Sequence, residues 1–320
     1  MTFINSVTGK IHSSELGFTL VHEHLRVRSV ELATQFPHLY NHDEEFQLAK
    51  DQVLSVKNAG VNTICDPTVM GQDRDVVFMR EISECTGVRI IAATGIYTLQ
   101  DLPEPLRNKD IDYVADLFIR DIEVGIQNTE IKAGFLKCAT DIPGITPDVE
   151  KVIRAVARAH KRTGVPIMTH THAASKNGLN QLDLLEEEGV SAGSVIIGHS
   201  GDSNDFSYLT QLLNRNTLLG FDRFGLSMGM YSSERPGIIL QLIEQGYYKQ
   251  LVVSQDYCGS IDWWDREEVL RFAPDWSMTH ITTHLFPYLI EKGVGPEILN
   301  EITVNNVRKW FEHAGNQVAN

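Results

Sequence analysis

Short apolar runs recur along the whole chain, and most of them are followed by a segment with helical spacing. The runs are rich in β-branched or bulky apolar residues, which is typical of strands that are buried on both faces of a parallel sheet. Eight of them lie at 18–22, 61–66, 89–97, 134–140, 165–171, 194–200, 217–223 and 250–256. The pattern therefore predicts eight buried strands.

The segments between these runs carry helix signals. The clearest begins with Thr146 as the N-cap and Pro147 at the first helical position, and it stops at Gly164. A second helix is expected over 43–60, ending at Gly60, because one helical face there carries Phe46, Ala49, Val53 and Val56.

A strand followed by a helix, eight times over, predicts a parallel sheet, since parallel neighbours need a crossover of about a dozen residues. Eight such units suit an α/β fold of the closed (β/α)₈ TIM-barrel type, with one domain over residues 1–320. The competing architecture is a doubly wound open sheet. The sequence shows neither a GxGxxG motif after its first strand nor a composition break that would mark a second domain.

Composition narrows the possible partners. Of the 320 residues 42% are hydrophobic and 22% are charged, a balance typical of a globular protein with a large core, and 28 basic residues against 42 acidic ones give a net charge of −14. Such acidity argues against nucleic acid and anionic membranes as partners. We expect a cytoplasmic protein, because the sequence shows no signal peptide and no bilayer-spanning run. Its four widely spaced cysteines fit reduced thiols.

Polar residues close nearly every apolar run, and in a barrel the carboxyl ends of the strands form the active site. His22 and His24 lie two apart on one strand, so both imidazoles can turn into the mouth. Imidazole and carboxylate ligands suit zinc and other first-row divalent metals, although a chance pair of hydrogen-bonded histidines is the alternative. The strand-closing residues are His22, Glu23, His24, Tyr97, Lys137, His170, His199, Arg223 and Asp256.

Lys137 is the unusual member of this set. An ammonium beside divalent cations would be repelled by them and penalised by burial. A neutral amine can instead react with carbon dioxide and form a carbamate, whose two oxygens could bridge two metals. The alternative is a lysine whose stem packs at the strand end while its charge reaches water.

Seven motifs together resemble the phosphotriesterase-like lactonases of the amidohydrolase superfamily. They are LVHEHL at 20–25, DPT at 66–68, GFLKCAT at 134–140, VPIMTHTH at 165–172, IIGHSGD at 196–202, GFDRFGL at 220–226 and SQDYC at 254–258. The resemblance implies a homodimeric barrel enzyme with two divalent metals per chain, which could be zinc, iron, cobalt or manganese.

In this resemblance one metal is ligated by His22, His24 and Asp256, and the other by His170 and His199. An N6-carboxylysine at Lys137 and a hydroxide bridge them. His172 departs from the family pattern, because it lies two residues beyond His170 and faces the same way. We keep His170 as the ligand and assign His172 to the pocket wall or the surface.

The expected chemistry is attack of the bridging hydroxide on an ester carbonyl, with the metals stabilising the oxyanion. Asp256 would carry the proton to the departing alkoxide, while Asp202 and Arg223 would pass it outward or hold Asp256. The alternative for Asp202 and Arg223 is a structural ion pair. A loop at 258–266 would cover the mouth, with Trp263 or Trp264 as an apolar wall for an acyl chain. We place the substrate against Tyr97, Arg223, Cys258 and Trp263.

The resemblance implies hydrolysis of a small-molecule substrate, either N-acyl-homoserine lactones or related oxo-lactones, with organophosphate triesterase activity as a side reaction. The first alternative is a primary phosphotriesterase (aryldialkylphosphatase) or another ester or amide hydrolase of the same superfamily. The second alternative is a barrel that binds but does not catalyse.

Overall fold

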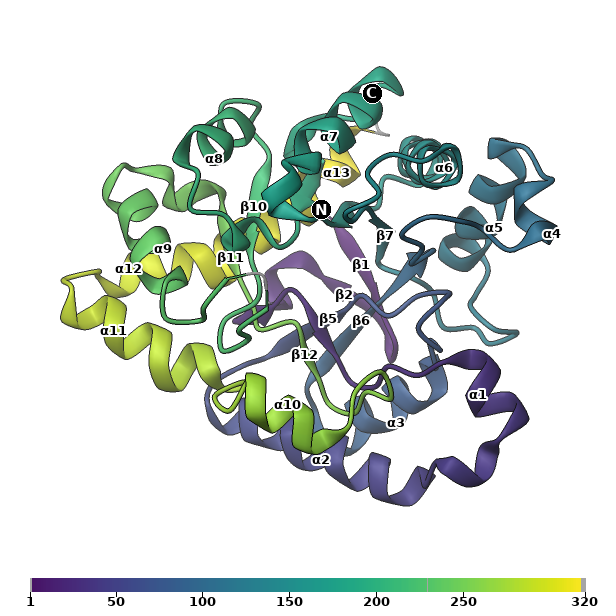
Figure 1. Cartoon of the computed structure of the whole chain (residues 1–320), viewed down its shortest axis with the longest axis horizontal. Coiled ribbons are helices and arrows are strands. Elements are labelled where there is room, and N and C mark those ends of the chain that lie inside the picture. The colour runs from purple at the N-terminus through teal and green to yellow at the C-terminus, as the bar shows by residue number, and fades with distance from the viewer. Residues whose placement is uncertain (1, 229, 318–320) are drawn as a thin grey trace.

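The computed structural model describes residues 2–228 and 230–317, and its centre is one sheet of eight parallel strands. The strands follow one another around the sheet in chain order, and the helices surround them (Figure 1). This confirms the predicted (β/α)₈ barrel and rules out the doubly wound open sheet. The strands are β3 (Thr19–Leu20), β5 (Thr63–Asp66), β6 (Arg89–Gly95), β7 (Phe135–Ala139), β8 (Ile167–His170), β9 (Val195–Ile197), β10 (Leu218–Phe221) and β11 (Leu251–Val253).

The barrel closes beyond the ends of β3 and β11. There the short strands β4 (Glu23–His24) and β12 (Tyr257–Cys258) pair in parallel. The backbone N–H of Asp256 donates to the carbonyl of His22 at 3.0 Å, and that of Gly259 donates to the carbonyl of His24 at 2.9 Å. Closure therefore places the first strand's histidines beside the aspartate that follows the last strand.

Capping residues mark the ends of the helices, as α6 shows most clearly. In α6, Thr146 accepts a hydrogen bond from the Val149 N–H at 3.2 Å, Pro147 is the first residue, and Gly164 ends the helix with a φ of 71°, as predicted. The helices are α1 (Val30–Gln35), α2 (His42–Asn58), α3 (Val76–Thr86), α4 (Glu104–Arg107), α5 (Ile111–Glu123), α6 (Pro147–Thr163), α7 (Asn177–Glu187), α8 (Phe206–Leu213), α9 (Arg235–Glu244), α10 (Arg266–Phe272), α11 (Phe286–Glu291), α12 (Pro296–Asn300) and α13 (Asn306–Gln317).

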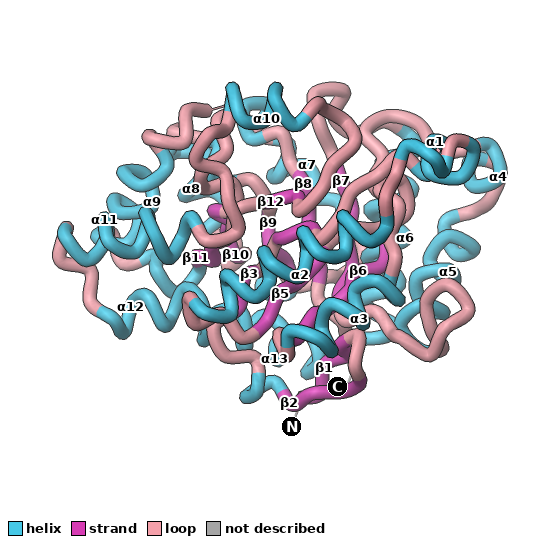
Figure 2. The backbone as a smooth tube through the Cα atoms, turned by 90° about the horizontal axis from the view of Figure 1, so that it is seen from below, coloured by secondary structure: helices cyan, strands magenta, loops and turns pink. Residues whose placement is uncertain are grey.

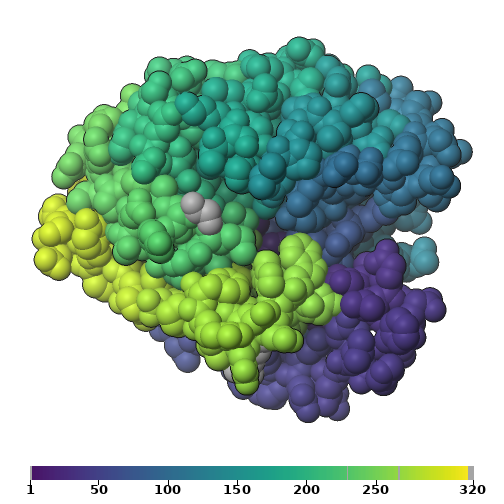
Figure 3. Space-filling model, in the orientation of Figure 1, coloured from purple at the N-terminus to yellow at the C-terminus, as the bar shows by residue number. Residues whose placement is uncertain are grey.

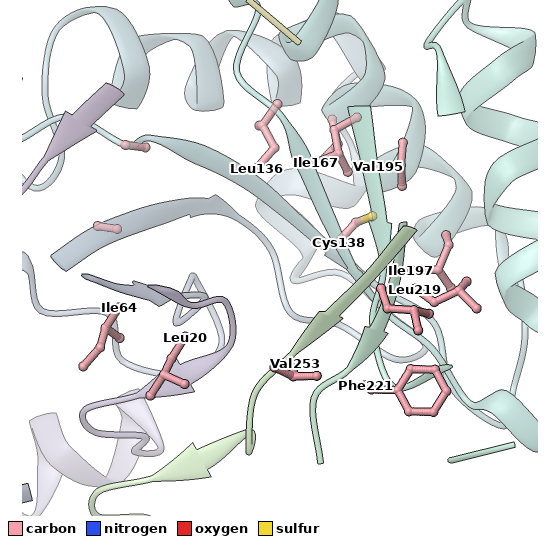
Figure 4. Packing of buried hydrophobic residues seen from close by; sticks show 14 of the residues in the cluster. Leu20, Ile64, Leu136, Cys138, Ile167, Val195, Ile197, Leu219, Phe221 and Val253 are labelled. Carbon is pink, nitrogen blue, oxygen red and sulfur yellow. The ribbon is translucent and has the colours of Figure 1, made fainter. Parts of the chain in front are cut away.

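Alternation along the strands produces two buried clusters. The larger one packs the strands against the helices and includes Ile64, Leu136, Ile167 and Val253, which Figure 4 shows on their strands. The smaller one comes from the opposite faces and fills the barrel with Cys65, Phe135, Met168, Ile196 and Val252, together with Trp310 of α13. The indole of Trp310 packs against Phe135 with ring centroids 5.8 Å apart and donates to the Ser194 carbonyl at 3.0 Å.

The two ends of the barrel differ. The antiparallel hairpin of β1 (Phe3–Ser6) and β2 (Gly9–His12) lies with α13 at one end, and α1 and α10 lie at the other (Figure 2). The carboxyl ends of the barrel strands point toward α1 and α10, so the candidate site lies there. No helix in the described residues is both long enough and apolar enough to cross a membrane.

Candidate metal centre and active site

The structure brings all six predicted metal ligands together at the mouth of the barrel. Oδ1 of Asp256 lies 3.2 Å from Nε2 of His22 and 3.4 Å from Nε2 of His24. On the other side of the mouth, Nε2 of His199 lies 2.8 Å from Nδ1 of His170. Nζ of Lys137, on β7, lies 3.3 Å from Nε2 of His22. The side chains thus form two adjacent groups of candidate ligands. His22, His24 and Asp256 make up one group and His170 and His199 the other, and the amine of Lys137 lies against His22 of the first group.

His199 and Asp256 follow their strands instead of closing them, which corrects the strand ends predicted at 200 and 256. β9 ends at Ile197 and β11 at Val253, and the two candidate ligands adopt left-handed conformations with φ of 58° and 50°. Such a conformation is strained for a residue with a Cβ and persists where its surroundings hold it in place. Here the backbone N–H of His199 donates to Asp222 Oδ1 at 2.8 Å, in addition to the Asp256 bond to His22 described above.

Asp222 is a functional residue that the sequence reasoning missed. Its side chain is fully buried directly after β10, where Oδ2 lies 2.9 Å from Nδ1 of His22 and Oδ1 lies 2.9 Å from Nδ1 of His199. Both imidazoles therefore carry their proton on Nδ1 and present the lone pair of Nε2 to the site. The motif GFDRFGL contains Asp222, but the sequence alone drew attention to the neighbouring Arg223.

The DPT motif has a similar supporting role. Oγ1 of Thr68 lies 2.7 Å from Nδ1 of His24, and the carboxylate of Asp66 accepts the backbone N–H groups of Thr68 at 2.9 Å and Leu25 at 3.0 Å. All of these groups are buried. Thr68 thus orients the third imidazole of the site, and Asp66 fixes the two loops that hold it.

On the other side of the mouth, Asp141 holds His170. Oδ2 of Asp141 lies 3.1 Å from Nε2 of His170, which leaves Nδ1 as the ring nitrogen that faces His199. His172, by contrast, turns its Nδ1 to Oγ of Ser175 at 2.7 Å and lies at the outer wall of the mouth. His170 therefore lies against His199 among the candidate ligands, and His172 lies outside them.

Glu23, the first residue of β4, lies between His22 and His24 and holds the segment that carries Asp256. Its carboxylate accepts the Ser254 hydroxyl at 2.6 Å, the Gln255 N–H at 2.7 Å and the Tyr257 N–H at 3.0 Å. Burial raises the pKa of Glu23 well above its usual value. The middle residue of HEH therefore points away from the site and joins the first strand to the last.

Electrostatics make these donor atoms suitable for a cation. Burial, together with the nearby Lys137, lowers the pKa of His22 to about 4, so its imidazole is neutral at neutral pH. Burial lowers the pKa of Lys137 to about 8, which makes its amine more readily available in the neutral form. Burial would raise the pKa of Asp222, but His199 and His22 outweigh it and lower that pKa.

Neutral imidazoles beside ionised carboxylates are the donor set that first-row divalent cations prefer. Potential ligand atoms of His22, His199 and Asp256 lie within 4.8 Å of one another, close enough to share one ion. His24 Nε2 and His170 Nδ1 extend this set on either side. The residues present therefore fit a metal centre.

Arg223 and Asp202 form a half-buried chain of ion pairs that leads away from Asp256. Nε of Arg223 donates to Asp256 Oδ2 at 2.9 Å, and its Nη1 donates to Asp202 Oδ2 at 3.0 Å. Asp202 in turn accepts from Nε and Nη2 of Arg235 at 2.9 and 2.6 Å. This geometry holds Asp256 in place and links it to the outer wall of the mouth, which is lined in part by Asp202.

The pocket above these groups has aromatic and apolar walls. The predicted substrate contacts Tyr97, Arg223, Cys258 and Trp263 all line it. The rings of Tyr97 and Trp263 lie 5.9 Å apart, and Trp263 is 38% exposed, at the rim. Burial raises the pKa of Tyr97 above its usual range, so its phenol keeps its proton. The segment around α10 lies beside the amino-terminal segment around α1 on this face (Figure 3).

A parallel barrel whose mouth gathers buried histidines and carboxylates defines the class of metal-binding barrel hydrolases. A model of the phosphotriesterase family matches residues 2–311. The chain belongs to the phosphotriesterase family, which confirms the family that the motifs predicted.

Individual relatives agree with this assignment over nearly their whole lengths. An aryldialkylphosphatase of Saccharolobus solfataricus is 46% identical over 303 residues, covering 94% of this chain and 96% of its own. The solved structure of the phosphotriesterase from Mycobacterium tuberculosis superposes with a TM-score of 0.94 at 40% identity, covering 97% of this chain and 98% of its own. Human N-acetyltaurine hydrolase is a more distant relative, 23% identical over 346 residues and covering 96% of this chain and 97% of its own.

Proposed function

We propose that this protein is a metal-dependent lactonase that opens N-acyl-homoserine lactones or related oxo-lactones and hydrolyses organophosphate triesters as a side reaction. The observation that carries the proposal is an apolar cavity of about 210 Å³ behind the loop that follows β12. It shares Cys258, Ile261, Trp264 and Trp276 with the walls of the catalytic pocket. An ester whose reacting carbonyl lies at the histidines would have an acyl chain directed along these shared walls.

The remaining lining of this cavity also suits an alkyl chain. It includes Leu48 of α2, Val269 and Leu270 of α10, and Ala273, which follows α10. An apolar chain that enters such a space loses contact with water at a gain of about 0.8 kcal/mol per methylene group. A compact aryl phosphotriester would leave most of this cavity unused, which favours the lactone as the primary substrate.

Two divalent cations, held by His22, His24 and Asp256 and by His170 and His199, would supply a water of lowered pKa and polarise the substrate oxygen. A carbamate on Lys137 would join the two ligand groups. Asp256 would take up the proton that the nucleophile releases and give it to the departing alkoxide. Arg223 would keep Asp256 oriented, and Asp202 would relay charge toward solvent. Tyr97 would contact the substrate beside the ligands.

The same proposal includes the assembly and location of the protein. The metals would be zinc, iron, cobalt or manganese according to supply, because histidine and carboxylate ligands accept all four. We also propose a homodimer in the cytoplasm that acts on small molecules and binds neither nucleic acid nor membranes.

A primary phosphotriesterase is the second candidate function. It is favoured by the name of the Saccharolobus solfataricus relative, an aryldialkylphosphatase at 46% identity. The two candidates are separated by kcat/KM for N-decanoyl-homoserine lactone and for an aryl dialkyl phosphotriester on the same metal-loaded preparation. A higher value for the phosphotriester would contradict the lactonase proposal.

A chain-length series tests the apolar cavity itself. Ser260 lines this cavity and not the catalytic pocket, so Ser260→Leu fills part of the chain space. We expect kcat/KM for the decanoyl lactone to fall about tenfold or more, whereas the value for the butanoyl lactone changes by less than about twofold. Ala174→Leu, an exposed position on the opposite wall of the mouth, is the matched control and should leave the ratio of the two values intact. Equal losses for both lactones in Ser260→Leu would contradict this use of the cavity.

A further inference from the structure

Gln72 is a buried amide in the wall of the catalytic pocket to which the chemistry above assigns no role. It follows β5 and is 3% exposed. It lines the pocket together with His24, Val27, Tyr97 and Ile261. A primary amide carries an oxygen that accepts hydrogen bonds and an NH₂ group that donates them, and both need partners.

The backbone determines which end of the amide is free. The N–H of Val69 donates to Oε1 of Gln72 at 3.4 Å, so the oxygen faces Val69. The Gln72 main chain is held on both sides, because its N–H donates to the Val69 carbonyl at 3.0 Å and its carbonyl accepts the Arg28 N–H at 3.3 Å. Since a backbone N–H can only donate, the amide cannot be turned over without losing the first of these bonds.

The NH₂ group of Gln72 is thereby left as a donor, and it makes no hydrogen bond to any residue in the described ranges 2–228 and 230–317. Nε2 of Gln72 is not among the enclosed side-chain atoms of the described residues that lack a partner, so it opens on the pocket that Gln72 lines. An acceptor on a molecule in the pocket would take the place of water at this donor. The amide is therefore preorganised for a bound acceptor.

We propose that Gln72 is a specificity-determining residue whose NH₂ donates to a neutral oxygen carried by the substrate beside its reacting carbonyl. The acyl-amide carbonyl of an N-acyl-homoserine lactone has this chemistry, and an alkyl lactone without an amide does not. This inference deepens the proposed function and rests on it. A site that is built to satisfy a polar substituent rejects the analogue that lacks it, because the site's own polar group is then left unpaired.

The charge around Gln72 favours a neutral acceptor over an anionic one. Arg28, whose backbone N–H binds the Gln72 carbonyl, pairs its guanidinium with Glu45 and also lies 3.9 Å from Asp73. Arg26 pairs with Asp75 at 2.8 Å. These cations are already balanced by carboxylates, so the amide offers a donor without net positive charge to attract an anion.

Two variants and two lactones test the inference. The lactones are N-decanoyl-homoserine lactone and a γ-lactone with an alkyl chain of matched length and no amide. Gln72→Leu removes the donor and the acceptor at similar volume. Gln72→Glu keeps an oxygen for the Val69 N–H and removes the donor, which separates recognition of the substrate from support of the turn. In both variants we expect the ratio of kcat/KM between amide lactone and alkyl lactone to fall about tenfold or more.

Equal losses for the two lactones, with the ratio unchanged, would overturn the role of Gln72 and leave the lactonase proposal standing. If the wild-type protein opens neither lactone, the proposed function fails. The role of Gln72 is then decided by the dissociation constants of the same two lactones, measured by quenching of the fluorescence of Trp263, Trp264 and Trp276 in the pocket. A wild-type preference for the amide lactone that both variants lose supports the inference, and equal preferences overturn it.

Discussion

Asp222 orients two imidazoles of the centre at once, which makes it the most consequential single residue outside the expected ligand set. One carboxylate oxygen faces His22 and the other faces His199, each at 2.9 Å from Nδ1. An ionised carboxylate accepts from both rings, whereas an amide in its place would offer one acceptor and one donor. One of the two rings would then have to change its tautomer or its orientation.

Asp222→Asn is therefore expected to lower the affinity for the metals by about 10- to 100-fold while the protein still folds. The measurement is metal retained per chain against a graded chelator. Asp202→Asn is the matched control, because Asp202 is a half-buried aspartate that contacts Arg223 and Arg235 instead of an imidazole. Metal affinity of Asp222→Asn equal to that of the control would show that the carboxylate does not set the tautomers.

At the scale of elements, the loop after β12 is attached to the first loop of the barrel by Asp262. Oδ2 of Asp262 accepts the Ser29 N–H at 2.8 Å and the Tyr40 hydroxyl at 2.7 Å. A parallel bridge between Val27 and Ile261 adds to this junction. Trp263 follows directly, so the position of this pocket wall depends on contacts with a segment more than 200 residues away.

Asp262→Ala should release this junction and let Trp263 move. We expect the KM for the decanoyl lactone to rise, the tryptophan emission to shift to longer wavelength, and stability to fall by about 2 kcal/mol from the two lost bonds. Metal content should stay the same, because no ligand touches Asp262. Tyr40→Phe removes only one of the two bonds, so its effects should be smaller and of the same sign. Unchanged emission and KM in Asp262→Ala would show that Trp263 is held by other contacts.

At the scale of the whole molecule, the centre joins strands from every part of the chain. Its six groups come from the segment between β3 and β4, from β4, β7 and β8, and from the turns after β9 and β11. Asp222 adds the turn after β10. Metal ions bound by these six groups would stabilise the folded barrel and not the unfolded chain. At a metal concentration 100 times the Kd this linkage amounts to about 2.7 kcal/mol.

Removal of the metals by a chelator should therefore lower the Tm by several degrees and abolish hydrolysis, and zinc, cobalt or manganese should restore both. His170→Ala should lose much of the metal-dependent change in Tm. His172→Ala, two residues away and bonded to Ser175, should keep it. A protein with less than one first-row metal per chain, no response of Tm to added metal and no activity would instead be the non-catalytic barrel considered as an alternative.

The sequence by itself predicted the eight strands, the closed barrel and the residues that meet at its mouth. It could do so because burial on both faces leaves a local apolar signature and because the active end of a barrel is fixed by strand direction. It overextended β9 and β11, since the left-handed turns at His199 and Asp256 are imposed by contacts from other strands.

The supporting contacts of Asp222, Thr68 and Glu23 became visible only in the folded structure. Each of them acts on a partner that is distant in the sequence. The spacing of apolar and polar residues along the chain does not show which distant side chains will meet. The closure between β4 and β12 is the physical reason, because it fixes which strand ends face one another across the mouth. Residue type and position predicted the candidate ligands, and the closed barrel determined which side chains orient them.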